Sequence, residues 1–122
     1  MCQFISFFHN PYSGDIAVKD LTSHSETQKL LGLNDKIWRE GHYLPDGTVE
    51  CRVIGSDRVS QEECNERLLG RFPTFAGFFN WCMVETGSNK KCSKWLNLSG
   101  CDLNGIKLPT SIGGWLNLSG CD

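Results

Sequence analysis

An identical run of eight residues occurs twice near the C-terminal end of this chain. Residues 95–102 and residues 115–122 both read WLNLSGCD, so the second copy follows the first at an offset of 20 residues. A match of this length at a fixed offset indicates an internal repeat. The alternating leucines fit a short strand that turns Leu96 and Leu98 inward, with SGCD forming the corner and LPTSIGG the return. The pattern predicts a short β-solenoid-like tail after a separate domain over residues 1–85.

Residues 1–85 predict an α+β domain with antiparallel strands in the order ββαββαα. The apolar runs at residues 2–9 and 15–19 flank a turn-rich loop, which predicts a first hairpin. A second hairpin is predicted over residues 36–54. It turns at Leu44–Gly47, where proline and glycine fit a type I turn with a G1 bulge.

The register of the second hairpin pairs residues of opposite charge on one face. His42 lies opposite Glu50, and Glu40 lies opposite Arg52, so like charges do not face each other. Trp38 is expected on the same polar face, as an exposed aromatic anchor for a partner. The other face of the hairpin carries the apolar members Tyr43, Val49, Cys51 and Val53.

Three helices are predicted from capping signals and apolar spacing. SHSE at residues 23–26 and SQEE at residues 60–63 are capping boxes that begin the first two helices. We expect Gly32 and Gly70 to end them in the left-handed conformation. Pro73 fits the first turn of a third helix. The apolar stripe of that helix is Phe75, Phe78, Phe79 and Cys82.

Residues 86–94 (TGSNKKCSK) predict a polar linker, and residues 95–122 predict a repeat stub of one full period plus eight residues. The stub, with its LxLSG, IKxLPxxI and GW elements, resembles the roughly twenty-residue leucine-rich-like arrays common in phage and prophage proteins, especially of gut bacteria. The order of residues 14–26 resembles domains that precede such arrays. This resemblance implies an origin and an architecture, and it implies no activity.

A solenoid this short cannot bury its own faces, because about three repeats are needed for that. The coils could dock on the preceding domain, the open end could stack on another subunit, or the array could be truncated. We expect docking combined with self-association, since an uncovered strand edge recruits a partner. Trp95 and Trp115 would then stack as an apolar ridge.

The seven cysteines do not predict a metal site. The chain has neither a CxxC pair nor a cysteine pair followed by a histidine pair at zinc-finger spacing. Cys51, Cys64 and Cys82 fall on predicted apolar faces, where cysteine acts as a small hydrophobic residue. Cys101 and Cys121 mark the same corner of successive coils. The odd count fits a reducing cytosol better than a closed set of disulfides.

Two groups of residues could support catalysis. Glu40, His42 and Cys51 resemble a base-activated thiol, but the predicted register places Cys51 on the face opposite His42. His24 lies in the first turn of a helix, where the macrodipole disfavours its protonated form. With Ser25 and Glu26 it forms an alternative site for a small molecule. The sequence contains no phosphate-binding glycine motif.

The charge balance limits the classes of partner. A net charge of -2 argues against broad nucleic-acid binding. The basic cluster Lys90, Lys91 and Lys94 is expected to be a solvated linker, and Glu63 with Arg67 stands at helical ion-pair spacing. No targeting segment and no apolar run near the roughly 20 residues needed to cross a bilayer is visible, so we expect a cytosolic protein.

We therefore expect a non-catalytic binding protein of phage or prophage type that acts in the host cytosol by blocking a host protein, as an anti-defence inhibitor would. It is expected to need no cofactor or metal. The alternatives are a nucleotide-binding or small-molecule-binding protein, or a hydrolase, that uses His24, Ser25 and Glu26, and a structural module that forms a homo-oligomer through its repeat ends. The expected protein-contact residues are Trp38, Arg39, Glu40, His42, Glu50, Arg52, Trp95 and Trp115.

Overall fold

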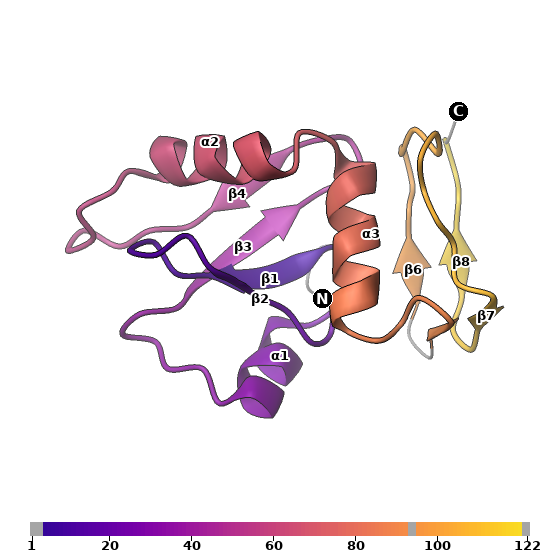
Figure 1. Ribbon diagram of the computed structural model, residues 1–122, viewed down its shortest axis with the longest axis horizontal. Helices are drawn as coiled ribbons and strands as arrows, with labels where there is room; N and C mark the ends of the chain where they lie inside the picture. The colour runs from indigo at the N-terminus through magenta and orange to yellow at the C-terminus, as the bar shows by residue number, and fades with distance from the viewer. Residues whose placement is uncertain (1–3, 93–94, 121–122) are drawn as a thin grey trace.

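The centre of the molecule is a four-stranded antiparallel sheet in the order β2-β1-β3-β4 (Figure 1). The computed structural model describes residues 4–92 and 95–120. The predicted α+β class, with three helices and antiparallel hairpins, is confirmed. The part of the first expected strand that includes Cys2 lies outside the described residues. The strands of the sheet are β1 (Ser6–His9), β2 (Ile16–Ala17), β3 (Arg39–Tyr43) and β4 (Val49–Cys51).

Helices cover both faces of this sheet (Figure 1). Helix α1 (His24–Leu31) lies against one face through His24, whose ring meets the rings of Phe8 and His42 edge-on. Helices α2 (Gln61–Arg71) and α3 (Phe75–Glu85) cover the opposite face. The side chains of β1 and β3 alternate between these two faces, as they must in extended strands.

The predicted starts of α1 and α2 are confirmed, but one predicted end and the start of α3 are wrong, because α3 begins at Phe75 after the N-cap Thr74 and so leaves Pro73 outside the helix. Ser23 and Ser60 cap α1 and α2 by accepting a hydrogen bond from the backbone N–H three residues on. Gly32 ends α1 with φ 63°. Gly70, in contrast, lies inside α2, which continues to Arg71 because the Phe72 N–H still donates to Leu68 O at 2.8 Å.

Aromatic rings fill the space between the sheet and α3. Phe78 packs between Phe7 and Tyr43, with ring centroids 5.1 Å from each. Gly41, opposite Phe7 in the sheet, makes room for this packing, because a Cβ there would lie 2.5 Å from the Phe7 ring. The predicted stripe of α3 is fully buried: Phe75, Phe78, Phe79 and Cys82.

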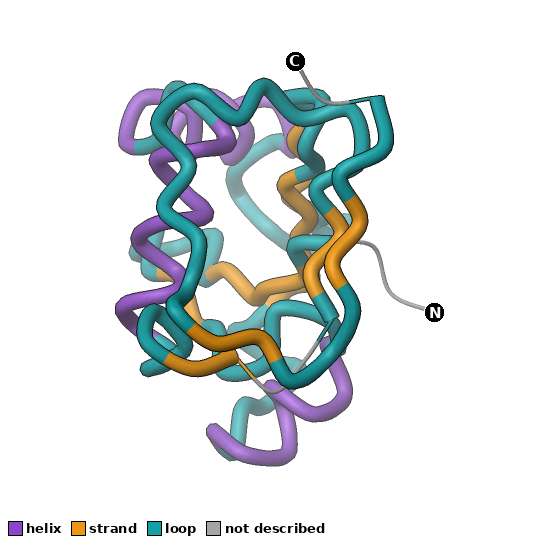
Figure 2. The backbone as a smooth tube through the Cα atoms, turned by 90° about the vertical axis from the view of Figure 1, so that its right-hand side faces the viewer, coloured by secondary structure: helices purple, strands orange, loops and turns teal. Residues whose placement is uncertain are grey.

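The two copies of the repeat run side by side, as Figure 2 shows. Strand β6 (Leu96–Asn97) pairs in parallel with β8 (Leu116–Asn117), so residues 20 positions apart lie opposite each other. Strand β5 (Lys91–Cys92) pairs in the same way with β7 (Ser111–Ile112). The Trp95 and Trp115 rings stack with centroids 5.1 Å apart and 6° between their planes.

The first copy of the repeat docks on α3. Leu96 and Leu98 are 1% and 0% exposed, and they join the same hydrophobic cluster as Phe79. The Asn80 side chain donates to Gly105 O at 2.7 Å and accepts from Lys107 N at 2.9 Å. Strand β5 lies within the segment expected to be a linker, and its Cys92 is buried.

Candidate functional site

A groove of about 330 Å³ lies where β3 begins. Phe8 is the buried apolar side chain in its lining, and Ile54, half exposed, belongs to the same lining. Trp38, just before β3, is partly buried, and its backbone N–H donates to Asn34 O at 3.2 Å. The groove also contains other residues that the sequence predicted for protein contact: Arg39, Glu40 and Arg52.

The predicted charge pairing across the hairpin is confirmed. His42 lies opposite Glu50, and its Nδ1 donates to Glu50 Oε1 at 3.2 Å. Arg52 connects the two acids, with its Nε 3.2 Å from Glu50 and its Nη1 3.5 Å from Glu40. The hydrogen bonds from His42 and Arg52 hold the pKa of Glu50 below its ordinary value.

Arg39 is buried, so its expected place on the exposed contact surface is corrected. The alternation of β3 turns Arg39 to the face opposite Glu40. Its Nε and Nη2 both donate to the Asp57 carboxylate at 2.9 Å. Asp57, for which no local sequence pattern predicted a role, also accepts from Tyr12 Oη at 2.8 Å and from Ile54 N at 3.0 Å. The Arg39 guanidinium holds the pKa of Asp57 well below its ordinary value.

His42 is also buried rather than exposed, because helix α1 covers it. The His24 ring lies edge-on to His42 at 4.9 Å, and His24 Nε2 donates to Gly41 O at 2.9 Å. Both side chains are therefore enclosed between α1 and the sheet. Burial lowers the pKa of His42, and the neighbouring His24 adds to that effect.

The residues of the alternative small-molecule site do not share a cleft. His24 points into the sheet, whereas Ser25 and Glu26 are exposed on the outer side of α1. The Ser25 Oγ lies 3.0 Å from Ser23 Oγ, within the helix cap. The arrangement therefore matches an N-cap at Ser23 with a buried histidine next to it.

The thiols of Cys51, Cys64 and Cys82 are held in their neutral form. Cys51 lies opposite Gly41 in the sheet and so on the other face from His42, as the register predicted. Burial raises the pKa of Cys51 to about 12 and also raises the pKa of Cys64 and Cys82. In the described part of the chain, no group of three or more His, Cys, Asp or Glu side chains is arranged to hold a metal ion. Cys121 lies outside the described residues.

The repeat tryptophans lie far from the hairpin residues with which they were grouped. Strand β3 begins on the left of Figure 1, whereas β8 is at its right-hand edge. Trp115 is 50% exposed there, and Leu116 and Leu118 are also exposed, at 36% and 38%. The expected contact residues thus form two separate surfaces.

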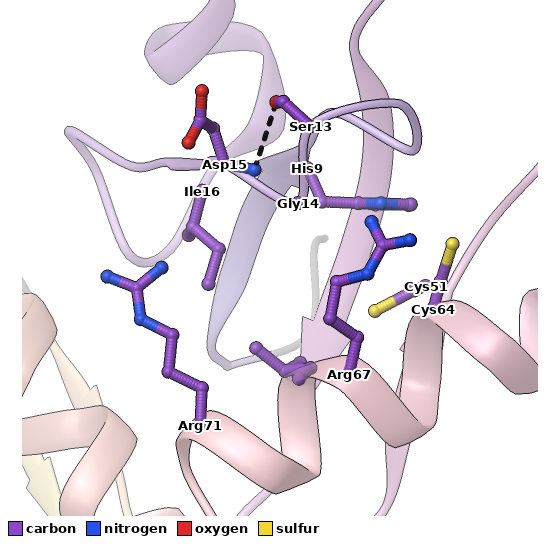
Figure 3. Close-up of a pocket in the computed structure, with 10 residues that line it drawn as sticks. His9, Ser13, Gly14, Asp15, Ile16, Cys51, Cys64, Arg67 and Arg71 are labelled. Atoms are coloured by element: carbon purple, nitrogen blue, oxygen red, sulfur yellow. Dashed lines mark hydrogen bonds between the residues drawn. The ribbon is translucent and has the colours of Figure 1, made fainter.

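A second cavity, of about 260 Å³, was not anticipated. It lies between α2 and the loop that joins β1 to β2, and Arg67 and Arg71 line it (Figure 3). Helical spacing predicted an ion pair between Arg67 and Glu63, but Arg67 Nη1 instead donates to Pro11 O at 3.2 Å. The four-residue spacing of Arg67 and Arg71 was the available signal, since it places both on one face of a helix.

Comparison with known proteins adds no family assignment. No protein-family model, no curated protein and no solved structure matches the chain. Within the described residues, no helix combines the length and the apolar character that a membrane span requires.

Proposed function

We propose that this chain is a non-catalytic binding protein that holds a partner protein in the groove at the start of β3. The observation that carries the proposal is the combination in one groove of Trp38, Arg52 and the apolar side chains of Phe8 and Ile54. Tryptophan and arginine dominate the energetics of protein interfaces, because they offer large apolar area with directional polar groups.

The groove favours a protein segment with an apolar side chain and flanking polar groups. The apolar side chain would contact Phe8 and Trp38, and the Arg52–Glu40 pair at the rim would bond the polar groups. Such a partly exposed ion pair contributes little to folding stability, so its groups can exchange partners at small cost. The resemblance of residues 95–122 to phage and prophage arrays supports a host protein as the partner. Binding would block that protein in the host cytosol, as an anti-defence inhibitor does.

Quantitative affinity capture from the cytosol of a panel of gut bacteria tests this proposal. A partner retained by the natural chain should be recovered at least roughly tenfold less by Trp38→Ala, the loss expected for a central interface tryptophan. Arg52→Ala, combined with Trp38→Ala, should reduce the recovery of the partner further. Val84→Ala is the matched control, because Val84 is an exposed apolar residue of α3 outside the groove. Equal recovery by the natural chain and the Trp38 and Arg52 variants would overturn the assignment of the groove.

A second candidate function is self-assembly through the repeat. We propose that the parallel, 20-residue pairing of β6 with β8 is the beginning of a β-solenoid. The open side of the second copy presents Leu116 and Leu118, whose counterparts in the first copy are covered. A second chain is the proposed occupant, since its exposed WLNLSG strand carries the same residues. Pairing of two such ends would give a closed two-fold dimer.

Light scattering after size-exclusion chromatography separates this candidate from the first. Dimerisation predicts a mass near twice 13.7 kDa at high protein concentration, with Leu118→Lys restoring the monomer. Leu108→Lys is a suitable control, because Leu108 is exposed but lies outside β6 and β8. A strict monomer at every concentration would eliminate self-assembly and leave the groove proposal intact.

A further inference from the structure

The hydrogen bonds between the two copies of the repeat define the outer edge of β8. The carbonyls of Trp115, Asn117 and Ser119 accept bonds of 2.8, 2.9 and 2.8 Å from backbone N–H groups of the first copy. Successive residues of a strand turn their backbone groups to opposite edges. The N–H and C=O groups of Leu116 and Leu118 therefore lie along the other edge of β8, which faces away from β6 (Figure 1).

This outer edge is unpaired in the described part of the chain. Among residues 4–92 and 95–120, no backbone hydrogen bond joins Leu116 or Leu118 to a further strand, and β8 pairs with β6 alone. The side chains of both leucines are exposed, although the matching Leu96 and Leu98 are buried. A strand edge that also carries exposed apolar side chains is a template for pairing with another chain.

The repeat itself shows which sequence fits this edge. Strand β8 covers β6, and the two strands have the same residues. The first copy offers no second free end, because Leu96 and Leu98 are buried in the same cluster as Phe79 of α3. Of the two ends of the described repeat, a chain can therefore present only the β8 end to a second chain. Two equal ends that meet form an isologous contact with a two-fold axis, so association stops at the dimer.

The leucine side chains set the direction in which two such edges pair. Leu116 and Leu118 lie on the same face of the small sheet as Leu96 and Leu98, which point into the core. The apolar interiors of two chains form one continuous core when the leucines of both β8 strands share a face of the joint sheet. A two-fold axis perpendicular to the sheet gives this arrangement and makes the strands antiparallel. A two-fold axis along the strands makes them parallel, but it turns the leucines of one chain to the opposite face.

We propose that two copies of this chain associate by antiparallel pairing of their β8 strands, with Asn117 of both chains at the two-fold axis. Leu116 then lies opposite the partner's Leu118 and exchanges both backbone hydrogen bonds with it, and Leu118 does the same with the partner's Leu116. In this register every outward N–H and C=O group of the two leucines is bonded. The pairing rests on the self-assembly proposed above, and it differs from the parallel pairing of β6 with β8 within the chain.

Disulfide cross-linking of the full chain tests this register. Cys2 and Cys121 are first changed to Ser, since they lie outside the described residues and the other five cysteines are buried. Facing residues of a non-hydrogen-bonded antiparallel pair have Cα atoms about 4.5 Å apart, which a disulfide can span. Asn117→Cys with oxidised glutathione, which accepts the two electrons and two protons of the paired thiols, should therefore give a covalent dimer. Its mass on a non-reducing gel should be near twice 13.7 kDa.

Ser119→Cys is the matched control, because Ser119 is exposed and lies two residues beyond Asn117. In the antiparallel register the two Ser119 residues are about 13 Å apart along the strands, too far for a disulfide, whereas a parallel in-register pairing would link them as well. Adding Leu118→Lys to the Asn117→Cys chain should abolish the link.

Light scattering on the same samples under reducing conditions separates the two levels of the proposal. A dimer in which Asn117→Cys does not link, or in which Ser119→Cys links as readily, overturns the antiparallel register and leaves self-assembly intact. A strict monomer overturns both.

Discussion

At the scale of single residues, Asp57 fixes the loops around the start of β3. Its carboxylate has no exposed surface and accepts hydrogen bonds from Arg39, Tyr12 and Ile54. Arg39 in turn donates to the carbonyls of Lys36 and Trp38. One buried ion pair thus connects the loops on both sides of the groove.

Asp57→Asn should destabilise the fold by about 3 kcal/mol, because it leaves the Arg39 guanidinium buried without a counter-charge. Urea unfolding measures this change in the free energy of unfolding. Glu66→Gln, at an exposed position on α2, should change it by less than about 0.5 kcal/mol. A loss for Asp57→Asn as small as that of the control would mean that water already solvates the pair.

Two buried histidines predict a loss of stability at mildly acidic pH. Burial lowers the folded-state pKa of both His9 and His42 from the ordinary value near 6.5. The unfolded chain therefore takes up protons that the folded chain does not bind. The free energy of unfolding should be highest above pH 7 and should fall as the pH drops below about 6.5.

Urea unfolding at pH 7.5, 6.5 and 5.5 measures how the free energy of unfolding depends on pH. His42→Gln, which cannot take up a proton, should lose less stability over that interval than the natural chain. Asp57 affects the free energy of unfolding at lower pH than the histidines do. Because its pKa is lowered in the folded chain, its contribution to stability is present above about pH 4 and is lost at more acidic pH. A natural chain equally stable at pH 7.5 and 5.5 would contradict the histidine argument.

The sequence predicted which residues pair across the hairpin, but it did not predict which of their side chains are buried. Charge alternation set the register, and so His42 and Glu50 were placed opposite each other correctly. Their exposure depends on which helix covers which face, and no local pattern encodes that choice. His24 covers His42 because α1 packs on that side of the sheet, and Asp57 was missed because its partner Arg39 is 18 residues away.

At the scale of elements, β6 and β8 have the same sequence in different surroundings. Leu98 is fully buried between α3 and the second copy, whereas Leu118, its counterpart, is 38% exposed. The two glycines that follow leucine in α1 and α2 differ in the same way. Gly32 ends its helix, but Gly70 does not, since the helix continues until Phe72 packs against Phe78 and Trp81. Identical local sequence therefore does not determine the local outcome when tertiary contacts differ.

The repeat provides a matched pair of substitutions. Leu98→Ala should cost about 2–4 kcal/mol, because it opens a cavity under a completely buried side chain. Leu118→Ala should cost less than about 1 kcal/mol, since its side chain is already in partial contact with water. Chemical unfolding at low protein concentration compares the two variants directly. Equal losses would indicate that a second chain covers Leu118 in solution.

At the scale of the whole molecule, one hydrophobic core spans the domain and the repeat. The cluster that contains Phe4 and Phe79 also contains Cys92, Leu96 and Leu98. Phe4 and Trp95 have ring centroids 5.9 Å apart. The polar composition of residues 86–94 predicted a linker, but that composition does not reveal that Cys92 is buried between two structured parts. The shared core leads us to expect that both parts unfold together.

A single unfolding transition is therefore expected for the whole chain. Trp38→Phe with Trp81→Phe leaves Trp95 and Trp115 as the fluorophores, so fluorescence reports the repeat while far-ultraviolet circular dichroism reports mainly the helices of the domain. The two curves should coincide in urea.

Asn80→Ala then tests the connection between the two parts. It removes the hydrogen bonds of 2.7 and 2.9 Å that join α3 to the repeat, which should cost about 1–2 kcal/mol. If the molecule unfolds as one unit, both curves shift together to lower urea, because the lost bonds destabilise a common folded state. A fluorescence curve that moves alone would mean that the repeat opens first, and that the shared core does not couple it to the sheet.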